Sequence, residues 1–397
     1  MNTRLLSIIK SEQERRNAPA VLAINEKTGR ESPFEKDGLG KLWIVLRAIR
    51  TVFHVISNFS TLKGGGIILP RKGHKYDEVE EELIEAGLKK KHISKTYGEP
   101  TFSSQIYAAK TILECLIAGI AYYNRKNAFK YFEVLFLYTA LNKWLLRHKK
   151  SSIWVIIGDL SPDLISLAAA CKYAGHSVIY WQYSLLDFKH LSVDADVAII
   201  LNNAGIELSK ISSDKDFYWR DIDTVETIDT DNISKGPVGI LLNVHAHEKV
   251  WERIFSIQNK IGLPCEVRFH PNSTLAIPEL PEEITIADKS ESLESFADRI
   301  SLAVCGNTQA QAKLMMMGVP VVQLEGLDQL YFDFHGYVQR DIVPGIRHPE
   351  EFKMSELVEF YHSEKYKLGL NNLIGPTGES RKPSLESFVD TFTKSDS

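Results

Sequence analysis

"SIWVIIGDLSPDLISLAAACKYAGHSVIYWQY", residues 152–183, predicts a strand, a helix and a second strand in succession. Residues 152–159 are a continuous apolar run, which is typical of a strand buried on both faces of a parallel sheet. Residues 161–175 begin with Ser-Pro and end with glycine, as helices often do. Strand, crossover helix and strand form the repeating unit of α/β folds. We therefore expect a doubly wound α/β layer in this part of the chain.

The same alternation returns beyond a polar stretch at residues 205–236. Apolar runs of strand length follow one another there, separated by segments of helix length. The predicted strands on either side of the polar stretch are GGGIILP (64–70), ADVAIILNN (195–203), VGILLNV (238–244), CEVRFH (265–270), ITIAD (284–288), SLAVCGN (301–307) and VPVVQLE (319–325). The sequence thus predicts two Rossmann-like units.

The length of 397 residues also favours two domains, because single cores rarely grow beyond roughly 250–300 residues. We expect a Rossmann-like domain with helical additions at 1–204, a linker at 205–236 and a second Rossmann-like domain at 237–346. Residues 347–397 are expected to form a C-terminal helical segment and tail.

The overall composition is that of an ordinary globular protein. Hydrophobic residues make up 44% and charged residues 25%, with a formal net charge of −4. No global basic excess points to nucleic acid as a partner. The cysteines form no CxxC or Cys/His ligand pattern, so we expect buried thiols in a reducing compartment. They are Cys115, Cys171, Cys265 and Cys305.

Two apolar segments bear on membrane contact. The segment 42–59 is interrupted by Arg47, Arg50 and His54, which argues against a spanning helix. The segment 127–150 contains charges and ends in Arg-His-Lys-Lys. Both are expected to be amphipathic helices, either packed in a domain or also touching an anionic membrane surface. Because the N-terminus has no adequate apolar run for a secretory signal, we expect a cytoplasmic protein, with a peripheral position at the inner face of the cell membrane as the variant.

Residues just after the strands are the candidates for ligand binding, because ligands of open parallel sheets lie outside the carboxyl ends of the strands. The second half of the chain supplies several polar residues at such positions. They are His245 and His247, then Arg268, His270 and Pro271, then Asp288, and finally Gly306, Asn307 and Thr308.

The Gly306-Asn307-Thr308 turn is expected to open a helix over residues 308–318. Unpaired main-chain N–H groups and the positive end of a helix dipole would face the ligand there, which suits a phosphate. The alternative is that Asn307 or Thr308 only caps the helix.

His270 has two interpretations as well. It can be a loop or core histidine, or it can stabilise the negative charge that develops on a phosphate leaving group, as a donor or as a cation. Its position at a strand end, beside the polar residues Asn272, Ser273 and Thr274, favours the second interpretation.

Residues 238–325 resemble the nucleotide-binding half of a group of bacterial GT-B glycosyltransferases that build capsules and lipopolysaccharides. The group includes sialyl- and polysialyltransferases, Kdo transferases and CDP-glycerol polymerases. The matching elements are His270-Pro271 for the His-Pro motif, Gly306-Asn307-Thr308 for the Gly-x-Ser/Thr turn, and Gly318-Val319-Pro320-Val321-Val322 for the Gly-x-Pro-x-x strand. The resemblance covers roughly a quarter of the chain.

The resemblance implies a fold in which two Rossmann-like domains face a cleft. It implies a nucleotide-sugar donor, with a cytidine nucleotide such as CMP-sialic acid or CMP-Kdo favoured, and a hydroxyl of a capsule or lipopolysaccharide glycan as acceptor. His270 and Thr308 would lie near the phosphate, with Arg268, Pro271, Gly306, Asn307, His245 and His247 as further donor-binding candidates. An inverting displacement without a metal or other cofactor is implied. Asp221-Ile222-Asp223 has the spelling of a metal motif but lies in the polar stretch.

The general base is the main departure from the family pattern. Sialyltransferases of this group carry an acidic pair before glycine, whereas here Lys36 interrupts the nearest match, Glu35-Lys36-Asp37-Gly38. Asp159 follows a strong predicted strand and is our candidate base. Asp163 is a weaker candidate because an acidic residue in the first helical turn is also favoured there by the helix dipole alone. His245 and His247 are a competing base-or-phosphate pair, or simply residues of a helix start.

Two other functions stay open at this point. A nucleotide-sugar epimerase shares the two-domain fold, although it would need more carboxylates around the sugar than can be placed. A non-catalytic assembly partner that kept the fold is suggested by the interrupted acidic pair.

Overall fold

The structure is a computed structural model of the chain. The residues it describes are 45–46, 48–53, 66–70, 74–95, 105–106, 108–113, 132–146, 152–157, 162–183, 195–202, 216–220, 226–244, 246–247, 249–330, 332–333, 335–374 and 382–395. They fall into two compact units. Unit 1 contains the described residues up to Arg220 together with 382–395, and unit 2 contains 226–374.

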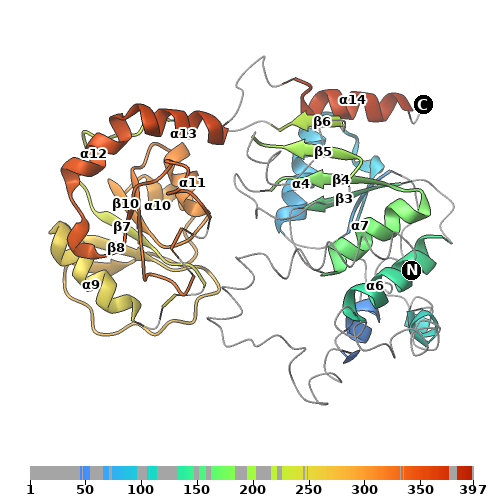
Figure 1. Ribbon diagram of the computed structural model, residues 1–397, viewed down its shortest axis with the longest axis horizontal. Helices are drawn as coiled ribbons and strands as arrows, with labels where there is room; N and C mark the ends of the chain where they lie inside the picture. Colours follow the sequence, from blue (N-terminus) through green and yellow to red (C-terminus); the bar gives the residue numbers. More distant parts are fainter. Residues whose placement is uncertain are drawn as a thin grey trace. The chain divides into compact units, whose positions relative to one another are not determined.

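Unit 1 is built on a sheet that has six parallel strands within the described residues, in the order β2-β1-β3-β4-β5-β6 (Figure 1). Its strands are β1 (Ile67–Leu69), β2 (Ile93–Lys95), β3 (Ile153–Ile157), β4 (Ser177–Trp181), β5 (Val197–Ile200) and β6 (Asp216–Trp219). Strand residues alternate between two cores because successive side chains of a strand point to opposite faces. The predicted strands at 64–70, 152–159, 177–183 and 195–203 are confirmed.

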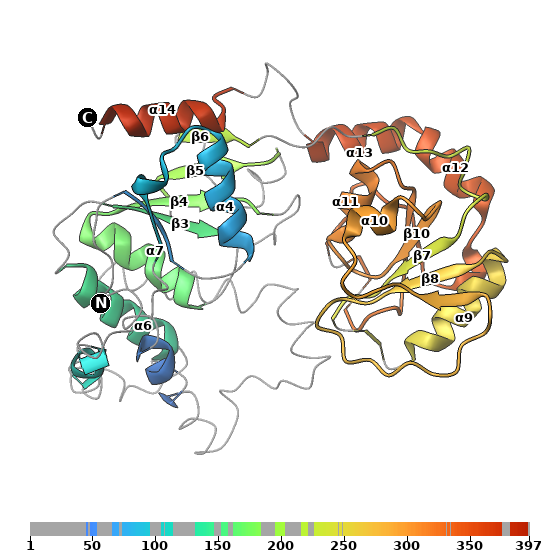
Figure 2. The same ribbon diagram turned by 180° about the vertical axis from the view of Figure 1, so that it is seen from behind.

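One face of this sheet packs against α4 (His74–Glu85), which follows β1, and α14 (Leu385–Ser395), the last helix. A short 3₁₀ turn, η1 (Lys90–His92), precedes β2. The other face packs against α6 (Phe132–Leu145) and α7 (Pro162–Ala174), which lie side by side in both ribbon views (Figure 2). Helical residues 48–53 and 108–113 contribute to the same core as α6.

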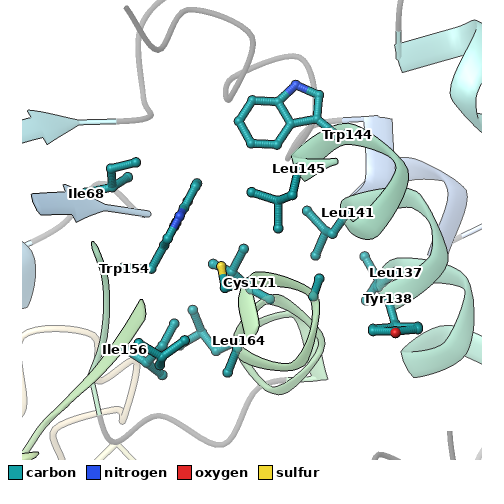
Figure 3. Close-up of a cluster of buried hydrophobic side chains, with 14 of the residues drawn as sticks. Ile68, Leu137, Tyr138, Leu141, Trp144, Leu145, Trp154, Ile156, Leu164 and Cys171 are labelled. Atoms are coloured by element: carbon teal, nitrogen blue, oxygen red, sulfur yellow. The ribbon is translucent and has the colours of Figure 1, made fainter. Parts of the chain in front are cut away.

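The core between β3, α6 and α7 explains why the quoted stretch decides the fold. Trp154 of β3 meets Trp144 of α6 edge to face, with ring centroids 6.2 Å apart, and Cys171 of α7 lies in the same cluster (Figure 3). Each large apolar side chain buried in this way contributes roughly 1.5–3 kcal/mol to folding. The continuous apolar run of β3 is needed because its two faces serve two separate cores.

The cysteines that the structure describes are buried thiols without a disulfide: Cys171, Cys265 and Cys305. Burial raises the pKa of Cys265 to about 12 and raises that of Cys305 further. The thiols are thus kept neutral, as small core residues. Cys115 lies outside the described residues.

Unit 2 contains a second parallel sheet, with six strands among the described residues in the order β12-β11-β10-β7-β8-β9. Its strands are β7 (Val238–Leu241), β8 (Cys265–Arg268), β9 (Ile284–Ile286), β10 (Leu302–Cys305), β11 (Val321–Leu324) and β12 (Gly345–Ile346). Read from β9 to β12, this is the 3-2-1-4-5-6 order of dinucleotide-binding folds. The second predicted Rossmann-like unit is confirmed.

Three helices lie between strands of unit 2 along the chain, and a 3₁₀ turn and two more helices follow its last strand (Figure 1). They are α9 (Val250–Ile261), α10 (Leu293–Ala297), α11 (Ala310–Met316), η3 (Pro349–Glu351), α12 (Met354–His362) and α13 (Glu364–Ile374). The phenol of Tyr361 on α12 accepts a hydrogen bond from Val321 N at 2.8 Å and donates one to Val321 O at 2.6 Å. Both hydrogen bonds pin α12 to the start of β11.

The predicted domain limits require correction. The expected linker 205–236 contains β6, which pairs with β5 and completes the sheet of unit 1. The expected tail 347–397 is divided as well, because α12 and α13 lie in unit 2 whereas α14 packs on unit 1, where Phe388 meets Tyr218 of β6. The short strand Asp216–Trp219 was missed because its polar surroundings hide the apolar run.

Two glycines end helices as predicted. Gly175 after α7 has φ +83° and Gly318 after α11 has φ +77°, a left-handed conformation that residues with a Cβ rarely adopt. No helix in the described part of the chain is both long enough and apolar enough to span a membrane.

Candidate functional site at the carboxyl edge of the second sheet

The order of the second sheet determines where to look for a site. β7 and β10 are neighbours at its centre, and the strand order reverses between them. In open α/β sheets, ligands bind outside the carboxyl ends of the strands at such a switch point. The residues that follow β7, β10 and their neighbours are therefore the candidates.

The turn after β10 requires glycine at position 306. A Cβ on Gly306 would overlap the carboxylate of Asp328. That carboxylate is buried and accepts a hydrogen bond from Asn307 N. Asp328 Oδ1 also accepts from Leu330 N at 2.8 Å and lies 3.3 Å from Asn307 Nδ2. The shape of the turn is thus set by a carboxylate that follows the next strand, β11.

The side chain of Asn307 serves this buried network. Its Oδ1 accepts from Gln323 Nε2 at 3.3 Å, and Asn243 Nδ2 donates to the Asn307 carbonyl at 3.0 Å. Gln311 Nε2 donates to Gly306 O at 2.6 Å and to Gln323 Oε1 at 3.0 Å. Because buried polar groups must be paired to avoid a desolvation cost, these bonds make the floor of the turn rigid. The Asn307 side chain therefore points into the protein rather than toward a ligand.

His335 adds a neutral imidazole to this network. Burial lowers its pKa to about 4, and a hydrogen bond to the main chain of Asn307 works in the opposite direction. Its ring centroid lies 5.7 Å from that of Tyr337. At neutral pH, His335 is therefore uncharged beside the turn.

Thr308 forms a local turn just before the next helix. Its Oγ1 accepts from Ala310 N at 3.3 Å. The helix α11 begins at Ala310 and has seven residues, shorter than the expected 308–318. The N-cap position itself is Gln309, which makes no side-chain capping bond, and so short a helix has little dipole to offer a phosphate.

The loop after β8 holds His270 with local hydrogen bonds. Asn272 N donates to His270 Nδ1 at 3.1 Å, and Ser273 N donates to His270 O at 2.8 Å. Phe269 is buried just before it, while His270 is half-buried and Pro271 is exposed. Since Nδ1 acts as an acceptor, the proton of the neutral ring resides on Nε2. His270 is therefore held with an N–H donor at the tip of its ring.

His247, after β7, is held in the same way. Lys249 N donates to His247 Nδ1 at 3.0 Å, so Nε2 again carries the proton of the neutral ring. The preceding residue, Ala246, bridges Asp328, and His247 N donates to Leu327 O at 3.1 Å. The loop after β7 is therefore docked on the loop that supplies Asp328. The predicted His245 lies outside the described residues.

Arg268 is held by partners within unit 2, and its buried Nη1 has no hydrogen-bond partner among the described residues. Its Nη2 donates to the carbonyl of Glu291 at 2.7 Å, and its guanidinium carbon lies 5.6 Å from the centre of the Phe296 ring. Arg268 thus ties the segment before α10 to β8. The carboxylate of Glu291 is paired with Arg299, which lowers the pKa of Glu291.

Asp288, after β9, also has a local partner. Ser290 N and Ser290 Oγ donate to its Oδ1 at 2.8 and 2.7 Å, and these bonds lower the pKa of Asp288. It acts as the acceptor of a turn at the edge of the sheet.

The predicted base Asp159 and the Asp221–Asp223 motif lie outside the described residues. In unit 1, the carboxyl ends of β4, β5 and β6 carry a buried polar cluster instead. Gln182 Nε2 donates to Asn202 Oδ1 at 3.1 Å, and Arg220 donates to both Gln182 O and Glu82 of α4. Within the residues that the structure describes, no group of three or more His, Cys, Asp or Glu side chains is placed to hold a metal.

A pocket of about 430 Å³ lies at the opposite edge of the second sheet. Its lining includes Gly236, Ser301 and Pro320, which precede β7, β10 and β11, together with part of residues 226–235. This is the amino-terminal edge of the strands, where doubly wound sheets do not place their ligand. The candidate site is therefore assigned to the strand ends rather than to this pocket.

Comparison with known proteins adds only broad likenesses. No protein-family model matches the chain, and no curated protein matches it. Among solved structures, the chain is similar to CalG4, the calicheamicin glycosyltransferase, with a TM-score of 0.49 and 11% identity, covering 85% of this chain and 100% of that one. It is similar to MurG from Acinetobacter baumannii with a TM-score of 0.44 and 11% identity, covering 83% and 100%.

A third similar structure is that of a protein from Listeria monocytogenes proposed to be a UDP-N-acetylglucosamine 2-epimerase. The TM-score is 0.46 and the identity 11%, covering 84% of this chain and 97% of that one. Likeness at this level concerns the course of the backbone alone. The chemistry of the site therefore rests on the chain's own residues.

Several residues of this site were not anticipated, namely Asn243, Gln311, Gln323, Asp328 and His335. Asp328 could have been found by applying the strand-end rule to β11, because it is the fourth residue after that strand. Gln311 and Gln323 carry no signal of their own in the sequence, since a polar side chain inside a helix or a strand usually faces solvent.

Proposed function

We propose that the chain is a glycosyltransferase that uses a nucleotide-activated sugar and binds its donor at the carboxyl edge of the second sheet. The observation that carries the proposal is the pair of histidines after the adjacent strands β7 and β8. His247 and His270 each accept a main-chain N–H at Nδ1, which places the proton of each neutral ring on Nε2. Fixed donors beside a dinucleotide-type switch point suit a phosphate group.

In this proposal, His270 stabilises the phosphate leaving group. In an inverting transfer, a base removes the proton of an acceptor hydroxyl, the hydroxyl oxygen bonds to the anomeric carbon, and the bond from that carbon to the phosphate oxygen breaks. The electron pair stays on the phosphate, whose negative charge increases. A donor that is already positioned stabilises this charge without reorganisation, an effect typically worth about 10²-fold or more in rate.

The rigid floor under the Gly306–Thr308 turn supports the same proposal. Gly306 allows the main chain to lie against the carboxylate of Asp328, and the Asn307 side chain is bonded inward. The N–H groups of Gly306 and Asn307 donate to Leu241 O and to Asp328, so the turn contributes a fixed shape beside the histidines rather than donors of its own.

The finer assignments come from the family resemblance. They are a cytidine nucleotide as the activating group, a glycan of a capsule or lipopolysaccharide as the acceptor, Asp159 as the base, and a reaction without a metal or other cofactor. Each stays a prediction that separate measurements can address.

A thermal-shift panel tests the donor site. CMP, CDP, UDP, GDP and ADP are added separately to the wild type, to His270→Ala and to His362→Ala. The last variant is a matched control, because His362 is an exposed histidine of unit 2 at the end of α12. We expect CMP or CDP to raise the melting temperature of the wild type and the control but not of His270→Ala, because a ligand stabilises only the state that binds it.

Each other outcome contradicts a defined part of the proposal. A preference for UDP or GDP overturns the cytidine assignment, and an equal shift in His270→Ala overturns the role of His270. No shift with any of these nucleotides overturns the donor site. Binding of a nucleotide without turnover of the corresponding sugar donor in the presence of acceptor glycan contradicts the transferase and favours a non-catalytic partner.

A further inference from the structure

The first turn of α9 carries an arginine whose charge is not paired. Arg253 is half-buried, and within the residues that the structure describes its guanidinium forms no ion pair and no hydrogen bond. Partial burial of a charged group costs free energy unless an acceptor offsets it. The guanidinium carries five N–H donors in a planar fork that matches the oxygens of a carboxylate or a phosphate. Arg253 is therefore a group suited to an anionic ligand.

The side chain of Arg253 lies across Gly326, the second residue after β11. A Cβ on Gly326 would lie 2.9 Å from Arg253 Nε and 3.6 Å from its Cζ. Gly326 also has φ +88°, a conformation that residues with a Cβ rarely adopt. Glycine at this position leaves the room that the arginine side chain occupies. Arg253 is thereby placed at the carboxyl edge of the second sheet.

His247 lies on the same surface as Arg253. Its main-chain N–H donates to Leu327 O at 3.1 Å, and Leu327 directly follows the Gly326 that Arg253 contacts. The loop after β7 and the first turn of α9 therefore rest on two consecutive residues of the loop after β11. The imidazole Nε2–H of His247 and the guanidinium of Arg253 are donors of one continuous surface within unit 2.

Two acidic residues on neighbouring elements have other partners. The carboxylate of Glu325, just before Gly326, has its Oε2 3.9 Å from Arg347 Nε. Glu350 of η3 accepts a hydrogen bond from Ser256 Oγ at 3.4 Å, further along α9. Neither carboxylate forms an ion pair with the guanidinium on α9.

The other acidic residues of this region do not pair with Arg253 either. Glu252 is exposed and, as the adjacent residue, is turned by about 100° around the helix. The buried carboxylate of Asp328 serves the turn after β10 and the main chain of its own loop. The remaining ionisable residues of the loop before α9, His245 and Glu248, lie outside the described residues. Among the described residues, the positive charge of Arg253 is thus not neutralised.

We propose that Arg253, beside His247, forms a second anion-binding subsite that holds a further oxyanion of the sugar donor. The inference rests on the proposed function, in which His270 contacts the phosphate next to the sugar. The shared chemistry of the ligand is a group with two or more anionic oxygens, either the second phosphate of a nucleoside diphosphate or the carboxylate of an acidic sugar. Arg253 then determines which donors bind tightly.

Calorimetric titration with CMP, CDP and CMP-sialic acid tests the subsite. CDP adds a phosphate to CMP, whereas CMP-sialic acid adds a carboxylate, so the two comparisons distinguish the sources of the oxyanion. We expect the wild type to bind at least one of the two about tenfold or more tightly than CMP, the gain typical of a hydrogen bond to a charged group. Arg253→Gln should lose most of this gain and keep the affinity for CMP. Loss confined to CDP assigns the phosphate, and loss confined to CMP-sialic acid assigns the carboxylate.

Two further variants control for charge and for shape. Lys260→Gln removes one positive charge from an exposed side chain in the last turn of the same helix and should bind all three ligands like the wild type. Arg253→Lys keeps the charge but not the planar fork, so it should restore only part of the gain. Melting curves check that the variants are folded.

Inorganic pyrophosphate separates the subsite from the proposed function, because it supplies linked anionic groups without a nucleoside. A wild type that binds pyrophosphate in an Arg253-dependent way but none of the three nucleotides would overturn the donor assignment and keep the subsite. Three results would overturn the subsite itself. They are a gain that Arg253→Gln retains, an equal loss in Lys260→Gln, and a wild type in which CDP and CMP-sialic acid show no gain over CMP and pyrophosphate does not bind.

Discussion

The loops after β10 and β8 are held in place in contrasting ways. The turn Gly306–Thr308 takes its shape from Asp328, a buried carboxylate that lies 21 residues beyond Asn307. The loop His270–Ser273 is held by short-range hydrogen bonds to His270, supplemented by Lys289 Nζ, which donates to Ser273 O at 3.4 Å. A turn fixed by distant groups forms a rigid floor, whereas a loop fixed locally can present one side chain with a defined tautomer. We therefore interpret the Gly306–Thr308 turn as a scaffold and the His270–Ser273 loop as the part that carries the chemistry.

Asp328→Ala should lower the free energy of unfolding more than any other substitution proposed for these two loops. It leaves the buried N–H groups of Asn307 and Leu330 and the Asn307 amide without their acceptor. Each unpaired buried donor costs about 1–3 kcal/mol, so the free energy of unfolding should fall by about 3 kcal/mol or more. Urea unfolding of the full chain measures this loss.

The matched control for Asp328→Ala is Asp288→Ala. Asp288 is an exposed acid that follows β9 at the edge of the same sheet, and its Oδ1 accepts hydrogen bonds from Ser290 N and Ser290 Oγ. Its loss should cost about 1 kcal/mol or less. Equal losses in the two variants would show that the Gly306 turn does not depend on the buried network.

His270→Ala should lower the rate of donor turnover strongly and leave the free energy of unfolding nearly unchanged. The half-buried ring makes a local bond to Asn272 N, so the free energy of unfolding should change by about 1 kcal/mol or less. The rate of donor turnover should fall by a factor on the order of 10² or more, because one charge-stabilising donor is removed. Steady-state kinetics and urea unfolding of the same preparation measure both. An unchanged rate, or a large loss of stability, would place His270 among the structural residues.

The strands of both sheets could largely be predicted from the sequence. Continuous apolar runs bounded by polar or glycine residues marked β3, β4, β5, β7 and β10, because strands buried on both faces need such runs. β6 escaped because Asp216–Trp219 is short and lies in a stretch rich in Asp, Ser and Lys. β12 is a two-residue strand, Gly345–Ile346, and has no run to detect.

The positions of the candidate site residues in the fold were predicted only in part. The strand-end rule identified His270 and the Gly306–Thr308 turn, since it depends on position along the chain. It could not foresee that Arg268 packs over Phe296, or that Asn307 faces inward, because these outcomes depend on partners brought close by the tertiary fold. The need for glycine at position 306 follows from the carboxylate of Asp328, which only the tertiary fold brings against it.

His335 gives the scaffold loop a dependence on pH. Its pKa is lowered in the folded state from 6.5 to about 4, so the unfolded chain binds a proton more readily between these values. The free energy of unfolding should therefore fall as pH decreases from about 6.5 towards about 4. His335→Gln should make this decline shallower, and unfolding curves at about pH 7 and about pH 5 measure the difference.

His362→Gln is the control for the pH prediction. His362 is exposed at the end of α12, where its Nε2 lies 3.1 Å from Thr230 Oγ1. Its replacement should leave the pH dependence close to that of the wild type. If His335→Gln and the wild type lose stability equally on acidification, His335 is not held neutral beside the turn.

Thr308→Val should have the smallest effect. Valine has nearly the same volume but cannot accept the hydrogen bond from Ala310 N. Loss of this bond should cost about 1 kcal/mol or less, and nucleotide binding should be retained because the hydroxyl oxygen serves the local turn with Ala310 N. A variant with normal stability and abolished nucleotide binding would make the Thr308 hydroxyl a ligand contact instead.

The most direct test compares the affinities of CMP and cytidine by calorimetric titration of the wild type and His270→Ala. The central claim is that the loop after β8 presents His270 to a nucleotide phosphate. The wild type should bind CMP more tightly than cytidine, and His270→Ala should lose most of that difference while keeping its affinity for cytidine. An equal ratio of the two affinities in both proteins would contradict the claim.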